Sequence, residues 1–198
     1  MRATMPSRAG VRRILLTLTV LILHGATPWP ATALAGAPAT TPASLIELRR
    51  HTELAMARGD YRAAEMLVET YLPAAQRLAE PTWLVFNAHL VATRIKLALD
   101  KVAEAEGHAL QLDSVAAAAG SSDDAMERAI AAITLSQVRQ RQDRSAEAAD
   151  LARQALAILR RAHERGRITR QTFERERLAY EEVLIAAGSG EKSAPALR

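Results

Sequence analysis

Apolar and polar residues between positions 44 and 187 do not alternate as they do in a half-buried strand, and no apolar run bounded by turn residues suggests one. The region is dominated by Ala, Leu, Glu, Arg and Gln, which favour the helical conformation. Glycine, proline and short polar residues divide it into seven segments of helical length. We therefore expect an all-α domain with helices at about 44–59, 61–79, 81–99, 101–119, 125–142, 146–165 and 170–187.

The residues at several predicted boundaries have recognisable roles. Pro81 stands in the first turn of the third helix, where its missing N–H costs nothing. Ser121 to Asp124 offer N-cap oxygens for the fifth helix, and Thr169 offers one for the seventh. Gly188 is a natural residue at a helix C-terminus. Pro73 falls inside the second helix and should kink it or end it early.

The seventh segment carries one apolar face. Phe173, Tyr180, Leu184 and Ala187 follow one another at steps of seven, four and three residues, which places them on one side of a helix. In a stack of helical hairpins the last hairpin exposes a hydrophobic side, and a final helix covers it. We expect the seventh helix to be this cap. The alternative is that the stripe docks a partner or a second copy of the chain.

Three of the helix boundaries align with one another. The segments that begin at Gly59, Asp100 and Asp143 can be superposed at spacings of 41 and 43 residues. The positions that then coincide are the alanines Ala64, Ala105 and Ala148, the small residues Thr52, Thr93 and Ser136, and the aliphatic residues Leu54, Ile95 and Val138. Small residues at repeated positions are expected where the two helices of a hairpin cross closely.

This pattern resembles the tetratricopeptide repeat, in a variant with longer helices and a period of about 42 residues rather than roughly 34. The resemblance covers Ser44 to His163. The third copy fits well, the first has His51 where an aliphatic residue is usual, and the second has Gly107 and His108 inside its second helix. The resemblance implies antiparallel hairpins stacked as a short α-solenoid with a C-terminal capping helix. A simple antiparallel bundle is the alternative.

The first 35 residues have the organisation of a secretory signal peptide. A basic stretch precedes an apolar run of about ten residues, Ile14 to Leu23, well short of the roughly 20 needed to span a bilayer. Small residues follow at alternate positions, and we place the cleavage after Ala35, with Ala33 or Ala37 as alternatives. We expect Sec export to the periplasm or the exterior, although a signal retained as a membrane anchor is an alternative. The expected segments are a signal peptide at 1–35, a disordered leader at 36–43, a helical domain at 44–187 and a disordered tail at 188–198.

The charge balance changes once the signal is set aside. The chain has 26 basic and 22 acidic residues, a formal net charge of +4. Four of the basic residues, Arg2, Arg8, Arg12 and Arg13, belong to the signal, which leaves 22 of each sign. A neutral domain lacks the positive surface that drives binding to a phosphate backbone, so we expect no nucleic-acid partner.

The helical domain shows no recognisable catalytic or metal-binding motif. It has no cysteine, no GxSxG nucleophile elbow and no Gly-rich phosphate loop. Its histidines, His51, His89, His108 and His163, are far apart in the sequence and form no HExxH pattern. We expect surface or partly packed histidines, no enzymatic activity, and no bound cofactor or metal.

In tetratricopeptide-like folds the first helices of successive hairpins line a concave groove, so the resemblance implies a groove for a protein or peptide. By position it would contain Arg49, Glu53, Met56, Asn87, Leu90, Arg94, Ile133, Gln137, Gln140 and Arg141. Asn87, Arg94 and Arg141 could hold a carboxylate, whereas Trp83 and Phe86 are expected in the core. We predict an adaptor or assembly factor for an envelope partner, able to self-associate. The alternatives are a small-ligand-binding accessory domain and a signal-anchored structural protein.

Overall fold

The computed structural model describes residues 41–78, 82–122 and 125–189. These residues form seven α-helices and no strand, which confirms the predicted all-α class. The helices are α1 (Pro42–Ala57), α2 (Tyr61–Gln76), α3 (Thr82–Ala98), α4 (Val102–Ala118), α5 (Met126–Arg141), α6 (Ser145–Glu164) and α7 (Arg170–Ser189). The predicted signal peptide, the leader up to residue 40, Pro81 and the tail after residue 189 lie outside the described residues.

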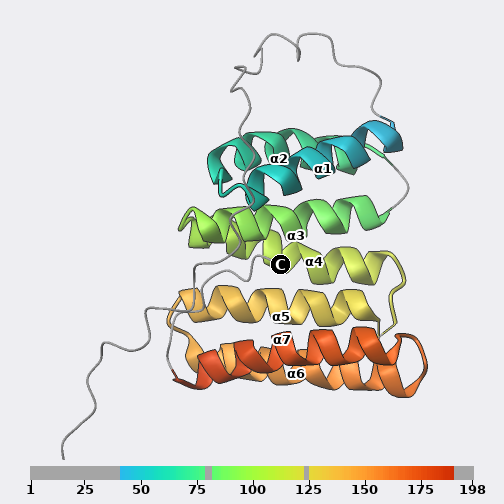
Figure 1. Cartoon of the computed structure of the whole chain (residues 1–198), viewed down its shortest axis with the longest axis vertical. Helices are drawn as coiled ribbons and strands as arrows, with labels where there is room; N and C mark the ends of the chain where they lie inside the picture. The colour runs from blue at the N-terminus through green and yellow to red at the C-terminus, as the bar shows by residue number, and fades with distance from the viewer. Residues whose placement is uncertain (1–40, 79–81, 123–124, 190–198) are drawn as a thin grey trace, which may run out of the picture. The chain divides into compact units, whose positions relative to one another are not determined.

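Consecutive helices pack against each other as in a helical repeat solenoid (Figure 1). In addition, α1 contacts α3, α3 contacts α5, and α5 contacts α7. Within the described residues no such contact joins α2 with α4 or α4 with α6. The odd-numbered helices are therefore direct neighbours in one row, while the even-numbered helices are held apart from one another.

The turns inside the three hairpins share one backbone conformation. Gly59, Asp100 and Asp143 have φ of +74°, +60° and +60°, in the left-handed region that ends many helices. The next residue in each turn donates its backbone N–H to the carbonyl five residues earlier. These bonds are Asp60 to Ala55 at 3.0 Å, Lys101 to Lys96 at 2.8 Å and Arg144 to Arg139 at 2.9 Å. Residues aligned in the sequence thus occupy the same place in three turns.

Two of the three aligned columns lie in the tight crossings between helices. All six of their side chains are fully enclosed, and Ser136 Oγ donates a hydrogen bond of 2.7 Å to the carbonyl oxygen of Ala148 on the facing helix. These residues are Ala64, Ala105, Ala148, Thr52, Thr93 and Ser136. The third column differs, because Ile95 and Val138 are buried but Leu54 is 39 % exposed. Among the described helices only α2 and α3 pack against α1, so no described hairpin precedes α1 to cover Leu54.

A repeated ion network joins neighbouring hairpins, and we call its two copies the ion staples. Each staple is a cation in the last turn of α3 or α5 that contacts a glutamate of the previous hairpin and a glutamate of its own, and Lys96 also lies 3.7 Å from Glu69 of the previous hairpin. The staples are Lys96 with Glu65 and Glu104, and Arg139 with Glu106 and Glu147. Lys96 Nζ lies 2.5 Å from Glu65 Oε1 and 2.6 Å from Glu104 Oε2. All three positions repeat at the spacings that align the alanines.

Several helix ends differ from the prediction. Helix α1 begins at Pro42, two residues early, because Thr41 and Ser44 form a reciprocal capping box. Pro42 and Ala43 therefore belong to the helix, with Thr41 as its N-cap, rather than to the predicted leader. Helix α5 has Ala125 as its N-cap, without a side-chain hydrogen bond, so neither Ser121 nor Ser122 caps it as predicted. Asp123 and Asp124 lie outside the described residues, and the carbonyl of Ser122 accepts the N–H of Ala125 at 2.8 Å.

Other predicted ends agree with the structure. Helix α2 continues three residues past Pro73 and stops at Gln76, earlier than the uninterrupted pattern suggested. Thr169 Oγ1 accepts the N–H of Thr172 at 3.1 Å and so caps α7, as predicted. Helix α7 ends at Ser189, one residue beyond the predicted stop at Gly188.

Helix α7 covers the end of the stack with the stripe that the sequence indicated. Tyr180 and Ala187 are buried, and Phe173 and Leu184 pack against the core formed with α5 and α6. This confirms the capping interpretation over docking by the same stripe. The opposite side of α7 also carries exposed apolar residues, Leu178 at 58 % and Ile185 at 71 %. None of the described helices is long and apolar enough to cross a membrane.

Candidate functional site

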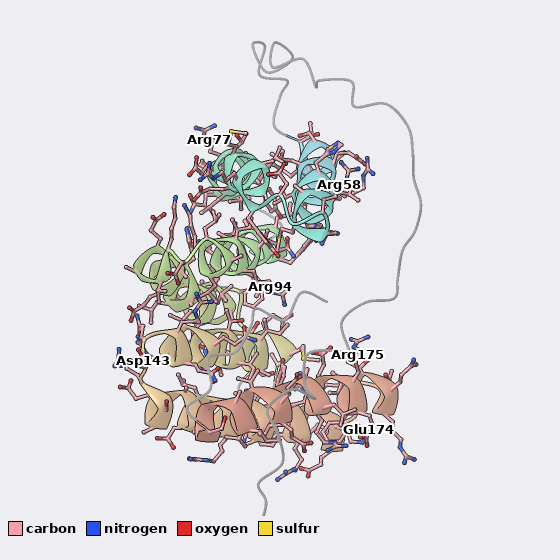
Figure 2. All side chains as sticks on the ribbon, turned by 60° about the vertical axis from the view of Figure 1, so that its left-hand side comes forward. Arg58, Arg77, Arg94, Asp143, Glu174 and Arg175 are labelled. Atoms are coloured by element: carbon pink, nitrogen blue, oxygen red, sulfur yellow. The ribbon has the colours of Figure 1, made fainter. Side chains whose placement is uncertain are left out.

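The best candidate for a binding site is one side of the row of odd-numbered helices, around Arg94 of α3. We call it the odd-helix face, and it consists of Arg49 and Glu53 of α1, Trp83, Asn87 and Arg94 of α3, and Arg175 and Glu176 of α7. Contacts or electrostatic interactions link these residues across helices that are separated in the sequence. Figure 2 shows Arg94 projecting from α3 on the same side of the stack as Arg175.

The ten residues predicted for a groove separate into two groups. Arg49, Glu53, Asn87 and Arg94 belong to the odd-helix face, and Gln137 of α5 is half-buried. The remaining five do not line an open groove. Met56, Ile133 and Gln140 are at most 8 % exposed, Leu90 packs against the cluster around Phe86 and Leu112, and Arg141 pairs with Asp100 at 2.5 Å. Adjacent side chains on a helix point about 100° apart. A small error in the assumed orientation of a helix therefore moves a predicted groove residue into the core.

The contact between α1 and α3 is aromatic and cationic. The guanidinium of Arg49 lies 5.6 Å from the centre of the Trp83 ring, within cation–π range. Trp83 is 46 % exposed, so its predicted place in the core is wrong, whereas Phe86 is buried as expected. Trp83 lies in the first turn of α3, and the contact with Arg49 covers only part of its ring.

A buried tyrosine holds Asn87 from behind. Tyr71 of α2 shares its hydroxyl proton between two acceptors, the carbonyl of Leu84 at 3.1 Å and Asn87 Oδ1 at 3.4 Å. Burial raises the pKa of Tyr71 to about 12, so the hydroxyl stays protonated. The amide of Asn87 is therefore oriented by the core, at a position on α3 two turns from Arg94.

Arg94 is the cation at the middle of the odd-helix face. Burial lowers the pKa of its guanidinium, while Glu176 of α7, Tyr180 of α7 and Glu53 of α1 act in the opposite direction. No hydrogen bond or ion pair joins Arg94 to a described residue. The two nearby acids have other partners, because Glu53 lies 3.7 Å from Arg49 and Glu176 lies 2.8 Å from Arg175.

Tyr180 presents a second unsatisfied group beside Arg94. Its side chain is 4 % exposed, and its buried hydroxyl has no hydrogen-bond partner among the described residues. Burial raises its pKa well above the ordinary value, so the group remains a proton donor at neutral pH. A buried hydroxyl without a partner is uncommon in proteins, since it loses its bonds to water without replacement.

A second polar cluster lies between α3 and α4, and no pattern of residues predicted it. The Nδ1 atoms of His89 and His108 lie 3.2 Å apart, although the residues are 19 positions apart in the chain. Burial, and then His108, lowers the pKa of His89 to about 4. Burial, and then the charge of Lys96, also lowers the pKa of His108. Both rings are therefore neutral at pH 7, and one donates its Nδ1 proton to the other.

The histidine pair is a packing contact of the second hairpin. In the alignment its positions correspond to Leu48 and Leu67 of the first hairpin, where two apolar side chains stand instead. The charged groups that act on His108 are Lys96 and Glu104, both of which belong to the first ion staple. In the described part of the chain no three His, Asp or Glu side chains are grouped so that they could hold a metal ion.

Two further histidines lie outside this pair. His163 stacks on Phe173 with ring centres 4.6 Å apart, which places it at the contact between α6 and α7. His51 is half-buried on α1.

Comparison with known proteins adds no functional information: no family model matches the chain, and no curated protein or solved structure matches it either.

Proposed function

We propose that this chain is an exported, non-enzymatic protein-binding module of the tetratricopeptide-like kind, which holds a partner of the cell envelope on its odd-helix face. The proposal of export rests on the pattern of the first 35 residues. The proposal of an adaptor or assembly factor rests on the odd-helix face itself. One observation carries it: an unpaired, half-buried Arg94 lies on the same face as a half-exposed Trp83.

Arginine and tryptophan are the side chains that most often dominate the free energy of protein–protein binding. Trp83 offers a large aromatic surface, and Arg49 already holds one side of that ring in place. Asn87 is fixed from behind by Tyr71, so the face is organised before a partner arrives. An ordinary solvated helix surface would not need these supporting contacts.

The direct experiment is site-specific photocrosslinking in the native host, with the full chain expressed from its own leader. A photoreactive amino acid replaces Trp83 on α3 or, as the matched control, Leu110 on α4. The two positions are similarly exposed, at 46 % and 49 %, but belong to the odd and the even rows of helices. We expect one partner to be crosslinked in stoichiometric amount from position 83 and not from position 110.

Crosslinking from position 110 alone, or equally from both positions, would contradict the odd-helix face as the binding site. The same sample tests export, because mass spectrometry reads the N-terminus of the purified chain. A start near Gly36 supports signal cleavage. An intact leader in the membrane fraction would instead favour the signal-anchored structural protein.

A further inference from the structure

Helix α7 has the place of a first helix in a fourth hairpin. It packs against α6 and also contacts α5, just as α5 packs against α4 and contacts α3 (Figure 1). The residues that face the preceding helix fix the correspondence. Leu135 and Val138 of α5 pack against alanines of α4, and Tyr180 and Val183 of α7, 45 residues later, pack against alanines of α6. The repeat therefore continues into α7.

The other side of α7 corresponds to the side by which the earlier first helices contact the helices that follow them. At this spacing Leu178 corresponds to Ile133 of α5, and Ile185 corresponds, two copies earlier, to Leu97 of α3. Ile133 packs in the cluster that α5 forms with α6 and α7, and Leu97 packs against alanines of α4. Both are enclosed, at 7 % and 4 % exposure, whereas Leu178 and Ile185 are open to solvent because no described helix follows α7.

We call this side of α7 the terminal face. Ile185 is the most exposed large apolar side chain in the described part of the chain, and Leu178 lies two helical turns before it on the same side. The outer side of a terminal repeat is ordinarily polar, since it remains in water. An apolar pair at hairpin positions therefore indicates that another helix binds there. The terminal face consists of Glu174, Arg177, Leu178, Glu181, Glu182 and Ile185.

One position shows how the terminal face differs from the earlier hairpins. Where the helices of a hairpin cross, the aligned residue is small and enclosed, as Ser136 is, but in α7 it is Glu181. Arg177 binds both oxygens of Glu181 at 2.7 Å and also contacts Glu174 at 2.9 Å. A glutamate is longer than a serine, so a helix docked here cannot approach as closely as α6 approaches α5. It must also offer a polar donor to the carboxylate.

The charge of the terminal face selects the kind of helix. From Leu178 to the end of α7 there are two acids, Glu181 and Glu182, and no basic residue. The carbonyl end of the helix adds a partial negative charge. The two acids lie midway between Leu178 and Ile185, so pairing α7 with the α7 of a second copy, in either direction, brings four carboxylates together. A second copy is therefore disfavoured, and a basic helix is complementary.

We infer that the terminal face binds one basic amphipathic α-helix of a partner protein, in the place of the second helix of a fourth hairpin. Bound antiparallel to α7, this helix places apolar residues opposite Ile185 and Leu178 and a lysine or arginine between them, opposite Glu181. Its pattern is apolar at positions i and i+7 and basic at i+3 or i+4. The terminal face is separate from the odd-helix face, so this inference goes beyond the proposed function and does not depend on it.

The test selects helical peptides by phage display on the protein purified after expression of the full chain. The library is an alanine-rich helix that is randomised at positions i, i+3, i+4 and i+7 of one face. We expect enrichment of apolar residues at i and i+7 with Lys or Arg between them. Binding of the best synthetic peptide is then measured by fluorescence anisotropy.

Three variants locate the binding. Ile185→Ser should weaken it about 10-fold, while the Tm of the free protein stays unchanged because the side chain is mostly exposed. Glu181→Gln should weaken it about 2- to 5-fold, and this loss should disappear for a peptide with Gln in place of its basic residue. Met66→Ser, at a side chain that is 68 % exposed on α2, is the matched control and should bind like wild type.

Each contrary outcome has a definite meaning. If no helical peptide is selected, or if the peptides bind Ile185→Ser as tightly as wild type, the inference is overturned and the odd-helix face is unaffected. Peptides whose binding is lost in Trp83→Ser instead would support the odd-helix face and contradict this site.

The same variants test the other occupants. Sedimentation of the free protein as a dimer that Ile185→Ser dissociates would overturn the inference in favour of a second copy. A gain in peptide binding of 10-fold or more on deletion of residues 190–198 would assign the terminal face to the tail of the chain itself. Selection of acidic residues between the apolar positions would contradict the basic character of the partner helix.

Discussion

The second and third hairpins have the same backbone but different interiors. Their turns, their enclosed alanines and their ion staples coincide at a spacing of 43 residues. Between α5 and α6 the interior is built from small and aliphatic residues, with Ser136 bonded to a carbonyl. Between α3 and α4 the corresponding space contains His89 and His108, whose pKa values are lowered mainly by burial.

This difference shows which residues decide the shape of a hairpin. A left-handed residue in the turn and a pair of small side chains at the crossing are common to both hairpins, and they suffice to set the geometry. The remaining contact positions are free to hold titratable groups. Sensitivity to pH should therefore be concentrated in the second hairpin, while the third should be the more sensitive to changes in volume.

The largest effect is expected from overpacking the third hairpin. Ala148→Leu inserts three carbon atoms at a position with no exposed surface, where α5 and α6 cross. We expect a loss of about 3 kcal/mol in the free energy of unfolding, measured by urea denaturation followed by circular dichroism. Ala105→Leu should cost a similar amount. Ala146→Leu, on the exposed side of α6, is the control, and an equal loss there would contradict the crossing geometry.

The next effect is the response of the second hairpin to acid. The pKa of His89 is about 4 in the folded state, below its ordinary 6.5, so the unfolded chain takes up the proton first as the pH falls. The stabilisation is complete above pH 6.5 and is lost between pH 6.5 and 4. We expect a loss of up to about 2 kcal/mol between pH 7 and pH 5.

The matched variant places the residues of the first hairpin in the second. His89→Leu with His108→Leu copies the equivalent Leu48 and Leu67. This double variant should flatten the stability profile between pH 7 and 5. The carboxyl groups of Glu65, Glu104 and Glu106 have lowered pKa values, so they titrate below this window. An unchanged slope in the double variant would show that other groups carry the pH dependence.

The two ion staples should differ in strength. When Lys96→Met removes one cation, Glu65 keeps Lys101 at 2.7 Å, so we expect a cost of about 1 kcal/mol. When Arg139→Met removes the other, Glu106 keeps only the neutral amide of Gln142, at 2.6 Å, and we expect about 1.5 kcal/mol. Thermal unfolding at low and high salt measures both. The reverse order of costs would show that the second partner does not matter.

The smallest effects come from one substitution made at two glycines. Gly59 has φ of +74°, which alanine adopts at a cost, so Gly59→Ala should lose about 1 kcal/mol. Gly107 lies inside α4 with open space around its Cα, so Gly107→Ala should gain about 0.7 kcal/mol. Chemical denaturation of both variants gives the two signs directly. Equal signs would contradict the assignment of Gly59 to the turn and Gly107 to the helix.

Much of the fold could be predicted because it depends on local residues and on their spacing. The all-α class, the seven helices, the turns at Gly59, Asp100 and Asp143 and the cap by α7 all follow from patterns within about 40 residues. The alignment also contained the cations of the ion staples, since Lys96 and Arg139 coincide in it. The start of α1 at Pro42 was not predicted, because its capping box lies in a stretch of small residues.

The candidate site could be predicted only in part. The sequence indicated four residues of the odd-helix face, including Arg94, because the register of a repeat tells which helices form one row. It also placed Met56, Ile133 and Gln140 in the groove, and these residues are buried, because the register does not give the rotation of each helix about its axis. Trp83 was missed because an aromatic side chain in a helix is usually core, and exposure depends on what covers it.

The sequence by itself determined the helices, their order and the positions at which they cross, since helix propensity, turn conformation and small-residue spacing are properties of short segments. Only the tertiary structure decided that His89 meets His108, that Arg141 is paired with Asp100, and that Arg94 and Tyr180 are left without partners. The physical reason is that pairing, burial and pKa depend on groups brought together from distant helices, and no segment of the chain contains that information alone.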